Sequence, residues 1–156
     1  MRGVKRVNLR DAPFLCRQIY ADGQGGKLLK SEKHNLRGKP DYIYKSIITG
    51  RLIPMELKSS EVDDMPNYGD LMQLAAYFLI IEDAMGSPRP KKGYLRYKNA
   101  MFKVKNTARL RRNLLSVVED MREMLATGEG SANPSFVNCR YCVARGTVCE
   151  FTSKST

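Results

Sequence analysis

The sequence predicts an α/β fold with one small mixed sheet at its centre and helices on its flanks. Residues 36–58 and 93–105 each contain two short runs of strand character joined by a turn, which is typical of paired strands. Each stretch is followed by a segment of helical character, the first apolar throughout and the second amphipathic. Strand pairs that alternate with helices favour a single sheet covered by helices, and 156 residues can bury a core without disulfides.

We expect one domain, residues 1–156, in three parts. Residues 1–35 would form an N-terminal helix and loop that carry the first cysteine. Residues 36–127 would form the core, and residues 128–156 a cysteine-rich segment.

The first expected element is a short helix over residues 11–20. Asp11 can cap it, Pro13 suits its first turn, and Cys16 would lie on it. The polar, glycine-rich segment 23–33 that follows predicts a loop.

A strand pair and a buried helix come next. Residues 36–48 predict a strand that turns back at residues 49–50, and residues 52–58 predict the returning strand. Residues 68–85 are apolar almost all round, as in a helix buried in a core, and Gln73 is the odd polar residue there.

A second hairpin and an amphipathic helix complete the core. Residues 93–98 and 101–105 predict two strands joined by a short turn. Apolar residues then recur at helical spacing up to residue 127. Thr107 can cap this helix and Gly128 stands where a helix normally ends.

The charge of the chain points to a polyanionic partner. Lys and Arg number 27 against 16 Asp and Glu, which gives a formal charge of +11 and an isoelectric point near 9.7. Nucleic acid is the leading partner, with a basic ribosomal or membrane-surface protein as the alternative. The longest apolar stretch, residues 74–81, is too short to span a bilayer, and no apolar segment follows the basic N-terminus as in a secretory signal. We therefore expect a cytoplasmic protein that does not enter a membrane.

Two carboxylates and a lysine form the first candidate site. Asp41 and Glu56 stand on opposite sides of the predicted turn, so the hairpin can bring both acids together. Alternation along a strand puts Glu56 and Lys58 on one face, with Met55 and Leu57 on the core face. Paired carboxylates in a partly buried site need a cation, and their oxygen atoms suit Mg²⁺ or Mn²⁺. Lys58 would orient a water molecule or stabilise the transition state. The alternative is a surface hairpin with solvated charges.

Gln73 and Tyr77 form a second candidate pair, because residues four apart lie on the same face of a helix. An amide and a phenol that project together from a core helix can hydrogen-bond phosphates or a metal-bound water. The alternative is a hydrogen-bonded core glutamine beside an ordinary tyrosine.

The cysteines indicate a metal site. Cys139, Cys142 and Cys149 form a C-x₂-C-x₆-C pattern, and Cys16 is a distant fourth. Spacing alone slightly favours zinc over an iron–sulfur cluster, and free core cysteines are the remaining alternative. A metal there would tie the N-terminal segment to the C-terminal one.

Taken together, these residues resemble the RecB-like exonucleases that carry an iron–sulfur cluster, and most closely the fourth CRISPR-associated protein family. The resemblance spans almost the whole chain, in the family order. It rests on the cysteine pattern and on the stretches 16–20, 36–41, 53–59, 73–77 and 93–95.

The resemblance implies a PD-(D/E)-x-K, restriction endonuclease-like core. It implies that Asp41, Glu56 and Leu57 contribute to binding a Mg or Mn ion and that Lys58 is the catalytic lysine. Gln73 and Tyr77 would then be the family's Q-x-x-x-Y motif, with catalytic roles.

The resemblance also shifts the expected cofactor of the four cysteines from zinc to a 4Fe–4S cluster. It implies a metal-dependent deoxyribonuclease that cuts single-stranded DNA ends. In antiviral defence, such proteins help to trim prespacers for the CRISPR integrase formed by Cas one and Cas two.

The chain departs from the family pattern between Cys16 and Asp41, where a shorter segment stands in place of a longer helical stretch with a metal-binding histidine. His34, the only histidine, could replace that ligand or be merely exposed, and Glu32 is a weaker substitute. Two alternatives to a nuclease remain: a catalytically silent DNA-binding or scaffold subunit, and a zinc-stabilised nucleic-acid-binding module.

Overall fold

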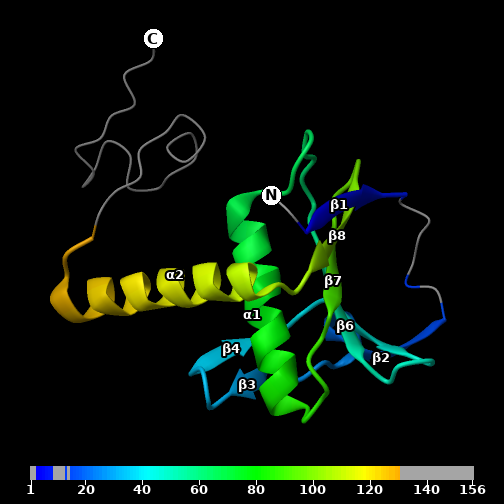
Figure 1. Ribbon diagram of the computed structural model, residues 1–156, viewed down its shortest axis with the longest axis horizontal. Coiled ribbons are helices and arrows are strands. Elements are labelled where there is room, and N and C mark those ends of the chain that lie inside the picture. Colours follow the sequence, from blue (N-terminus) through cyan, green and yellow to red (C-terminus); the bar gives the residue numbers. More distant parts are fainter. Residues whose placement is uncertain (1–2, 9–12, 14, 131–156) are drawn as a thin grey trace. The chain divides into compact units, whose positions relative to one another are not determined.

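The computed structural model of the protein describes residues 3–8, 13 and 15–130. These residues form an α/β fold with a mixed sheet and two α-helices (Figure 1). The chain divides into two compact units, Met1–Val117 and Val118–Thr156.

The strands are β1 Val4–Val7, β2 Cys16–Ala21, β3 Leu29–Ser31, β4 Leu36–Gly38, β5 Tyr42–Ser46, β6 Leu52–Leu57, β7 Lys92–Arg96 and β8 Met101–Lys105. The helices are α1 Tyr68–Ala84 and α2 Ala108–Thr127, and Asp22–Gln24 forms a single 3₁₀ turn.

The six-stranded sheet has the order β1-β8-β7-β6-β5-β2, and β3 pairs with β4 in a separate two-stranded sheet. Strands β6 and β7 run parallel, while their other neighbours are antiparallel. A parallel pair needs a long crossover, and α1 supplies it between these two strands. Both strands contact α1, and the end of β6, residues 55–57, is the part that pairs with β7.

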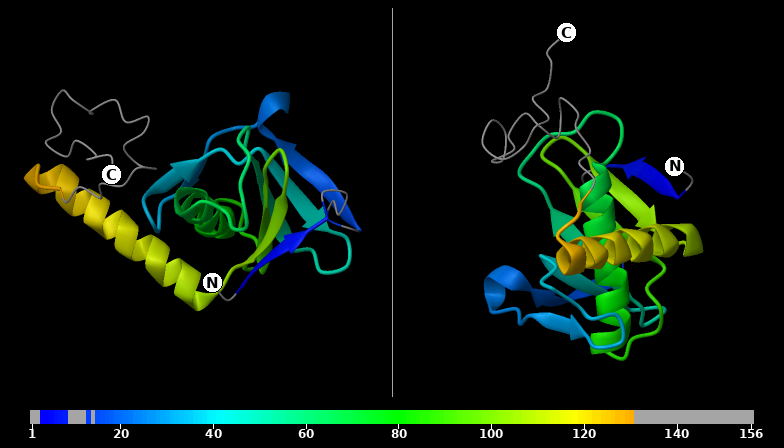
Figure 2. Two further views of the ribbon diagram at one scale, coloured as in Figure 1. Left: turned by 90° about the horizontal axis from the view of Figure 1, so that it is seen from above. Right: turned by 90° about the vertical axis from the view of Figure 1, so that its left-hand side faces the viewer.

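Helix α1 packs on one face of the sheet, as Figure 2 shows from two further directions. Its side chains Leu71, Leu74 and Phe78 are fully buried, which agrees with the apolar sequence of this segment. Gly93 on β7 allows the close approach, because a Cβ atom there would lie 2.9 Å from the Pro54 carbonyl oxygen and 3.0 Å from the Phe78 ring. The helix can thus place polar side chains close to the end of β6.

Several predicted elements are confirmed. Strand β6, helix α1, the β7–β8 hairpin and helix α2 lie close to their predicted bounds. The hydroxyl of Thr107 accepts a hydrogen bond from the Leu110 amide at 3.2 Å, as expected of a cap, and Gly128 has a φ of +73°. None of the helices in the described part of the chain is long and apolar enough to cross a membrane.

The prediction of an N-terminal helix on which Cys16 lies is wrong. Residues Cys16–Ala21 form β2, an edge strand that pairs antiparallel with β5. Pairing with a neighbouring strand outweighs the local helix signals, which is a common result for short segments. The start of the predicted helix, residues 11, 12 and 14, lies outside the described residues.

Three further boundaries differ from the prediction. The expected strand over residues 36–48 is two strands, β4 and β5, which belong to different sheets; Pro40 lies between them and has no amide hydrogen to donate to a strand partner. The expected loop over residues 23–33 contains β3, and β1 was not predicted. The division of the chain into the three predicted parts stays a prediction.

Candidate active site

Asp41 and Glu56 meet at the end of the β5–β6 pair. In that pair Tyr42 lies opposite Met55, so continuing the register by one position places Asp41 opposite Glu56. The Asp41 Oδ2 atom accepts a 2.6 Å hydrogen bond from the Leu57 amide, which fixes the aspartate against the last residue of β6. The turn between the two strands thus brings together acids that are well separated in the sequence.

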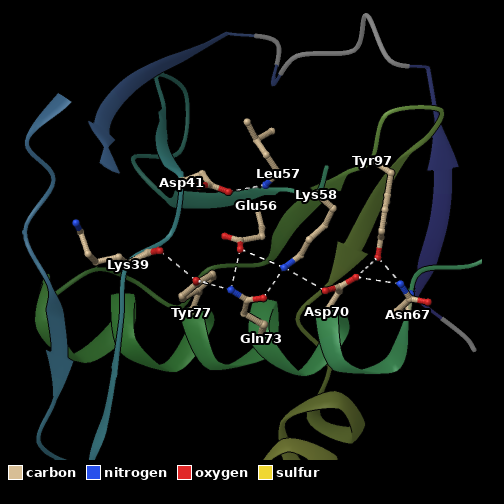
Figure 3. A network of polar contacts seen from close by, with 10 residues as sticks. All are labelled: Lys39, Asp41, Glu56, Leu57, Lys58, Asn67, Asp70, Gln73, Tyr77 and Tyr97. Atoms are coloured by element: carbon tan, nitrogen blue, oxygen red, sulfur yellow. Dashed lines mark hydrogen bonds and ion pairs between the residues drawn. The ribbon is translucent and has the colours of Figure 1, made fainter. Parts of the chain in front are cut away.

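Glu56 is buried, with only 7% of its surface exposed, and it points towards α1 (Figure 3). Its Oε1 atom accepts hydrogen bonds from Gln73 Nε2 at 2.7 Å and from Lys58 Nζ at 3.3 Å. Its Oε2 atom is also buried and by distance and angle has no hydrogen-bond partner among the described residues, although the Asp41 backbone amide is close enough to the carboxylate to lower its pKa. One oxygen of this carboxylate is therefore available to a ligand that the described residues do not provide.

The expected division of β6 into a polar face and a core face is wrong in part. Residues 52–56 are buried on both faces, because α1 covers one side and an apolar cluster with Met55 and Tyr94 lies on the other. Leu57, expected in the core, is 39% exposed. The strand buries Glu56 instead of presenting it to solvent, and this burial gives the carboxylate its unusual environment.

Lys58 lies at the centre of the polar network. Its Nζ atom donates to Gln73 Oε1 at 2.6 Å and lies 3.1 Å from Asp70 Oδ1, in addition to its contact with Glu56. The Lys58 amide donates to the Arg96 carbonyl at 2.7 Å, so the parallel pairing with β7 holds the backbone at this point. The ammonium group is thus surrounded by fixed acceptors.

Asp70 and Tyr97, which were not predicted from the sequence, are also part of the network. Tyr97 donates its hydroxyl hydrogen to Asp70 Oδ2 at 2.6 Å and accepts a hydrogen bond from the Asn67 amide at 3.2 Å. Asp70, Gln73 and Tyr77 stand at positions i, i+3 and i+7 of α1, which is one face of a helix. That spacing is the signal that could have identified Asp70.

Gln73 and Tyr77 lie together beside Glu56, as Figure 3 shows. Gln73 Nε2 donates to the Tyr77 hydroxyl at 2.8 Å as well as to Glu56, and Tyr77 donates to the Lys39 carbonyl at 3.1 Å. Gly38 leaves room for the tyrosine ring, since a Cβ atom there would lie 2.9 Å from Tyr77 Cε1. The network therefore extends from α1 back to the segment that precedes Asp41.

The ionisation of these groups follows from their burial. Burial raises the pKa of Glu56, and the nearby charge of Asp41 raises it further, while Lys58 acts in the opposite direction. Burial works to lower the pKa of Lys58, but its contacts with Asp70 and Glu56 outweigh this and raise it. Burial, as the largest cause, also raises the pKa of Tyr77 to about 12. At neutral pH, Lys58 is charged and Tyr77 keeps its hydrogen.

The site residues fit a divalent cation. The buried Oε2 atom of Glu56 lacks a partner among the described residues, and the carboxylate of Asp41 repels the negative form of Glu56. A cation would give the Glu56 Oε2 atom a partner and would offset the repulsion between the two carboxylates. Within residues 3–8, 13 and 15–130, no group of three or more Asp, Glu, His or Cys side chains is arranged for a metal. Backbone oxygens such as that of Leu57 and water would have to complete the ligand set, as is usual for Mg²⁺.

The structure does not bring His34 to this site. His34 lies in the turn between β3 and β4, where its amide donates to Ser31 Oγ at 3.2 Å. Hydrogen bonds from Ser31 and from the Lys33 amide lower the pKa of Asp83, and the nearby His34 side chain adds to this effect. Asp83 and Gln73 are about 15 Å apart along the axis of α1. Glu32 lies in the same turn as His34 and is exposed.

Cys16 lies on β2 opposite Ser46 and packs against the apolar cluster around Met55. Cys139, Cys142 and Cys149 lie outside the described residues. The predicted 4Fe–4S cluster and its zinc alternative therefore stay predictions.

Neither a protein-family model nor a curated protein sequence matches this chain.

Proposed function

We propose that the protein is a metal-dependent DNA nuclease of the PD-(D/E)-x-K type that acts on DNA ends. The observation that carries the proposal is the buried Oε2 atom of Glu56, which has no partner in the described part of the chain and lies beside a second acid. A buried carboxylate oxygen without a partner is costly for a fold to maintain. Its retention next to Asp41 and Lys58 supports a role in holding a cation for chemistry.

The chain's own residues would divide the work as follows. Glu56 and Asp41, with the backbone oxygen of Leu57, would hold a Mg or Mn ion. When bound, that ion would polarise the phosphodiester and lower the pKa of a water molecule. Lys58, kept protonated by Asp70, would place a positive charge where negative charge develops on the phosphate.

Gln73 and Tyr77 would orient the acids instead of reacting themselves. The amide hydrogens of Gln73 are directed at Glu56 and at Tyr77, so rotation of the Glu56 carboxylate would break a hydrogen bond. A fixed carboxylate keeps its other oxygen available to the metal, which is how a supporting shell of hydrogen bonds acts in metal sites.

DNA is the proposed substrate because the charge of +11 attracts polyanions. Action on single-stranded ends, trimming of prespacers with the integrase of Cas one and Cas two, and a 4Fe–4S cluster on Cys16, Cys139, Cys142 and Cys149 complete the proposal. These parts rest on the resemblance of the motifs to the fourth CRISPR-associated family.

One observation favours a catalytically silent DNA-binding subunit as the second candidate. Lys58 is already paired with Asp70 and Glu56, and no group of three or more acidic, histidine or cysteine side chains among the described residues is arranged to hold a metal ion. Such a closed network could simply stabilise the fold.

A cleavage assay with end-labelled single- and double-stranded DNA separates the two candidates. We expect wild-type protein to cut in Mn²⁺ or Mg²⁺ and not in EDTA, with Glu56→Gln and Asp41→Asn both inactive. Glu123→Gln, which changes an exposed acid on α2, is the matched control and should cut as wild type. Wild-type protein that binds DNA but leaves it intact with every metal would favour the silent subunit.

A further inference from the structure

A basic groove lies on the sheet away from the candidate active site. It has a volume of about 620 Å³, is open to solvent, and includes the start of β7 and the end of β8. None of the described residues that line it is acidic. Its cationic residues are Arg51, Arg89, Lys91, Lys92, Lys103 and Lys105.

The register of the sheet places groove cations directly opposite other lysines. Lys92 on β7 lies directly opposite Lys105 on β8, and Lys103 lies opposite Lys5 on β1. Like charges in directly opposed positions destabilise a sheet. None of the ion pairs formed by the described residues includes a cation of the groove. The protein thus maintains a repulsive arrangement that an anionic partner would relieve.

Hydrogen bonds fix the backbone around the groove. Arg51 Nη1 donates to the Arg89 carbonyl at 2.7 Å. Asn106 donates from its side chain to the Pro90 carbonyl at 2.7 Å and from its amide to the Lys91 carbonyl at 2.9 Å. The segment before β7 is therefore tied to the end of β8, which keeps the cations of both segments near one another without a ligand.

The groove and the candidate active site are separate. Arg51 immediately precedes β6 and Glu56 lies near its end, about 16 Å away at the rise of a strand. Gly93 and its pair partner Val104 face α1, so Lys92 and Lys105, one position away on each strand, face the opposite side of the sheet. Glu56 instead points towards α1. A ligand in the groove does not contact the carboxylates from there.

We propose that this groove is a second nucleic-acid-binding site, which takes the sugar–phosphate backbone of DNA apart from the carboxylates. Several cations along an open groove match a chain of regularly spaced phosphates better than a single phosphate ion. A concave surface also suits a strand that enters it, whereas a lipid surface requires a flat or convex one. The groove would hold DNA without regard to sequence and without a metal. It would therefore raise affinity without taking part in the reaction.

The test is DNA binding in EDTA, measured by fluorescence anisotropy over a range of salt concentrations. Lys103→Gln combined with Lys105→Gln removes two charges from the groove. Lys27→Gln combined with Lys30→Gln removes two exposed charges outside it and is the matched control. Each lost phosphate contact lowers the salt slope by about 0.7–0.9, so the groove variant should lose about 1.5 in slope. Its Kd should rise roughly tenfold at physiological salt, while the control stays close to wild type.

A second groove variant guards against a change in folding. Arg89→Gln combined with Lys91→Gln alters the segment before β7, where both side chains are exposed, and should reproduce the loss of slope. The proposal is overturned if both groove variants bind with wild-type Kd and salt slope, or if the control loses as much as they do. DNA binding is measured in EDTA, so this test does not depend on the nuclease proposal. If only the nuclease proposal fails, the protein will not cut DNA, but the salt slope of its DNA binding will still depend on the groove.

Discussion

The candidate active site and the basic groove differ in how their positive charges are paired. Lys58 is partly buried and contacts two acids and an amide oxygen, so its position and its protonation are both fixed. The groove cations have no acid among the described residues that line the groove, and the groove itself is open to solvent. A charge that is held by acids inside a fold is prepared to act on one atom, whereas unpaired charges on an open surface attract an extended partner. Variants should therefore separate turnover from binding.

The largest expected effect is that of Lys58→Ala on turnover. Loss of a positioned positive charge should lower kcat by roughly 10²–10³-fold. DNA binding in EDTA should change little, because the groove is intact. Single-turnover cleavage with saturating DNA and anisotropy give the two values, and Lys98→Ala, which changes an exposed lysine shortly after β7, is the control. Wild-type turnover in Lys58→Ala would place the chemistry elsewhere.

Gln73→Ala should slow turnover about ten- to a hundredfold. An orienting hydrogen bond to a charged group contributes about 1.5–3 kcal/mol, which corresponds to that range of rates. Affinity for DNA in EDTA should again stay at the wild-type value. A Gln73→Ala variant that loses affinity but keeps kcat would mean that the amide contacts DNA directly.

Asp70→Asn tests whether this acid positions Lys58. Removal of the negative charge takes away an attraction that raises the pKa of Lys58, so the pKa should fall. The alkaline limb of the rate–pH profile should then move to lower pH, with a decrease in kcat of about tenfold at neutral pH. Asp64→Asn, which changes an exposed acid in the preceding loop, should leave the profile unchanged. A lower rate with an unshifted profile would assign Asp70 a purely structural role.

The smallest expected effect is that of Glu56→Gln on stability. Unlike the preceding variants, which lower kcat, this one should improve the measured property, because the folded protein should become more stable. Because burial and Asp41 raise the pKa of Glu56, the folded protein favours its neutral form. This contribution to stability is present below the ordinary pKa of glutamate and is lost as the pH rises through the raised value. At neutral pH in EDTA, Glu56→Gln should therefore raise Tm, by about 2–4 °C for each kcal/mol of repulsion that it relieves.

Two further Tm measurements, one at low pH and one with added metal, provide the controls. At a pH where glutamate is protonated, the Tm values of Glu56→Gln and wild type should converge. Mn²⁺ should raise the Tm of wild type and leave that of Glu56→Gln nearly unchanged. A neutral-pH Tm for Glu56→Gln below that of wild type in EDTA would show that the carboxylate stabilises the fold.

Local sequence patterns predicted those residues of the candidate active site that lie close together in the sequence. The spacing of Glu56 and Lys58 and that of Gln73 and Tyr77 follow from strand and helix periodicity, and the structure brings all four together. Tyr97 reaches Asp70 only because β7 runs parallel to β6 beside α1, a pairing that no local pattern contains.

The groove was only partly accessible to sequence reasoning for the same reason. Lys91 and Lys92 are neighbours in the sequence, so their proximity is evident without the structure. Their proximity to Lys105 depends on the register of the β7–β8 hairpin. Their proximity to Arg51 depends on the hydrogen bond from Arg51 to the Arg89 carbonyl. Likewise, β2 was mistaken for a helix because its partner, β5, is distant in the sequence, with β3 and β4 between them.

The amide of Gln73 has consequences for how this sequence can vary in evolution. Its oxygen accepts from Lys58, and its nitrogen donates to Glu56 and to Tyr77. A glutamate at position 73 would place a second acceptor against the Glu56 carboxylate, and a lysine would face the Lys58 ammonium group. Only a side chain that donates on one side and accepts on the other satisfies both neighbours. Among homologues that keep this network, we therefore expect positions 56, 58 and 73 to change together or not at all.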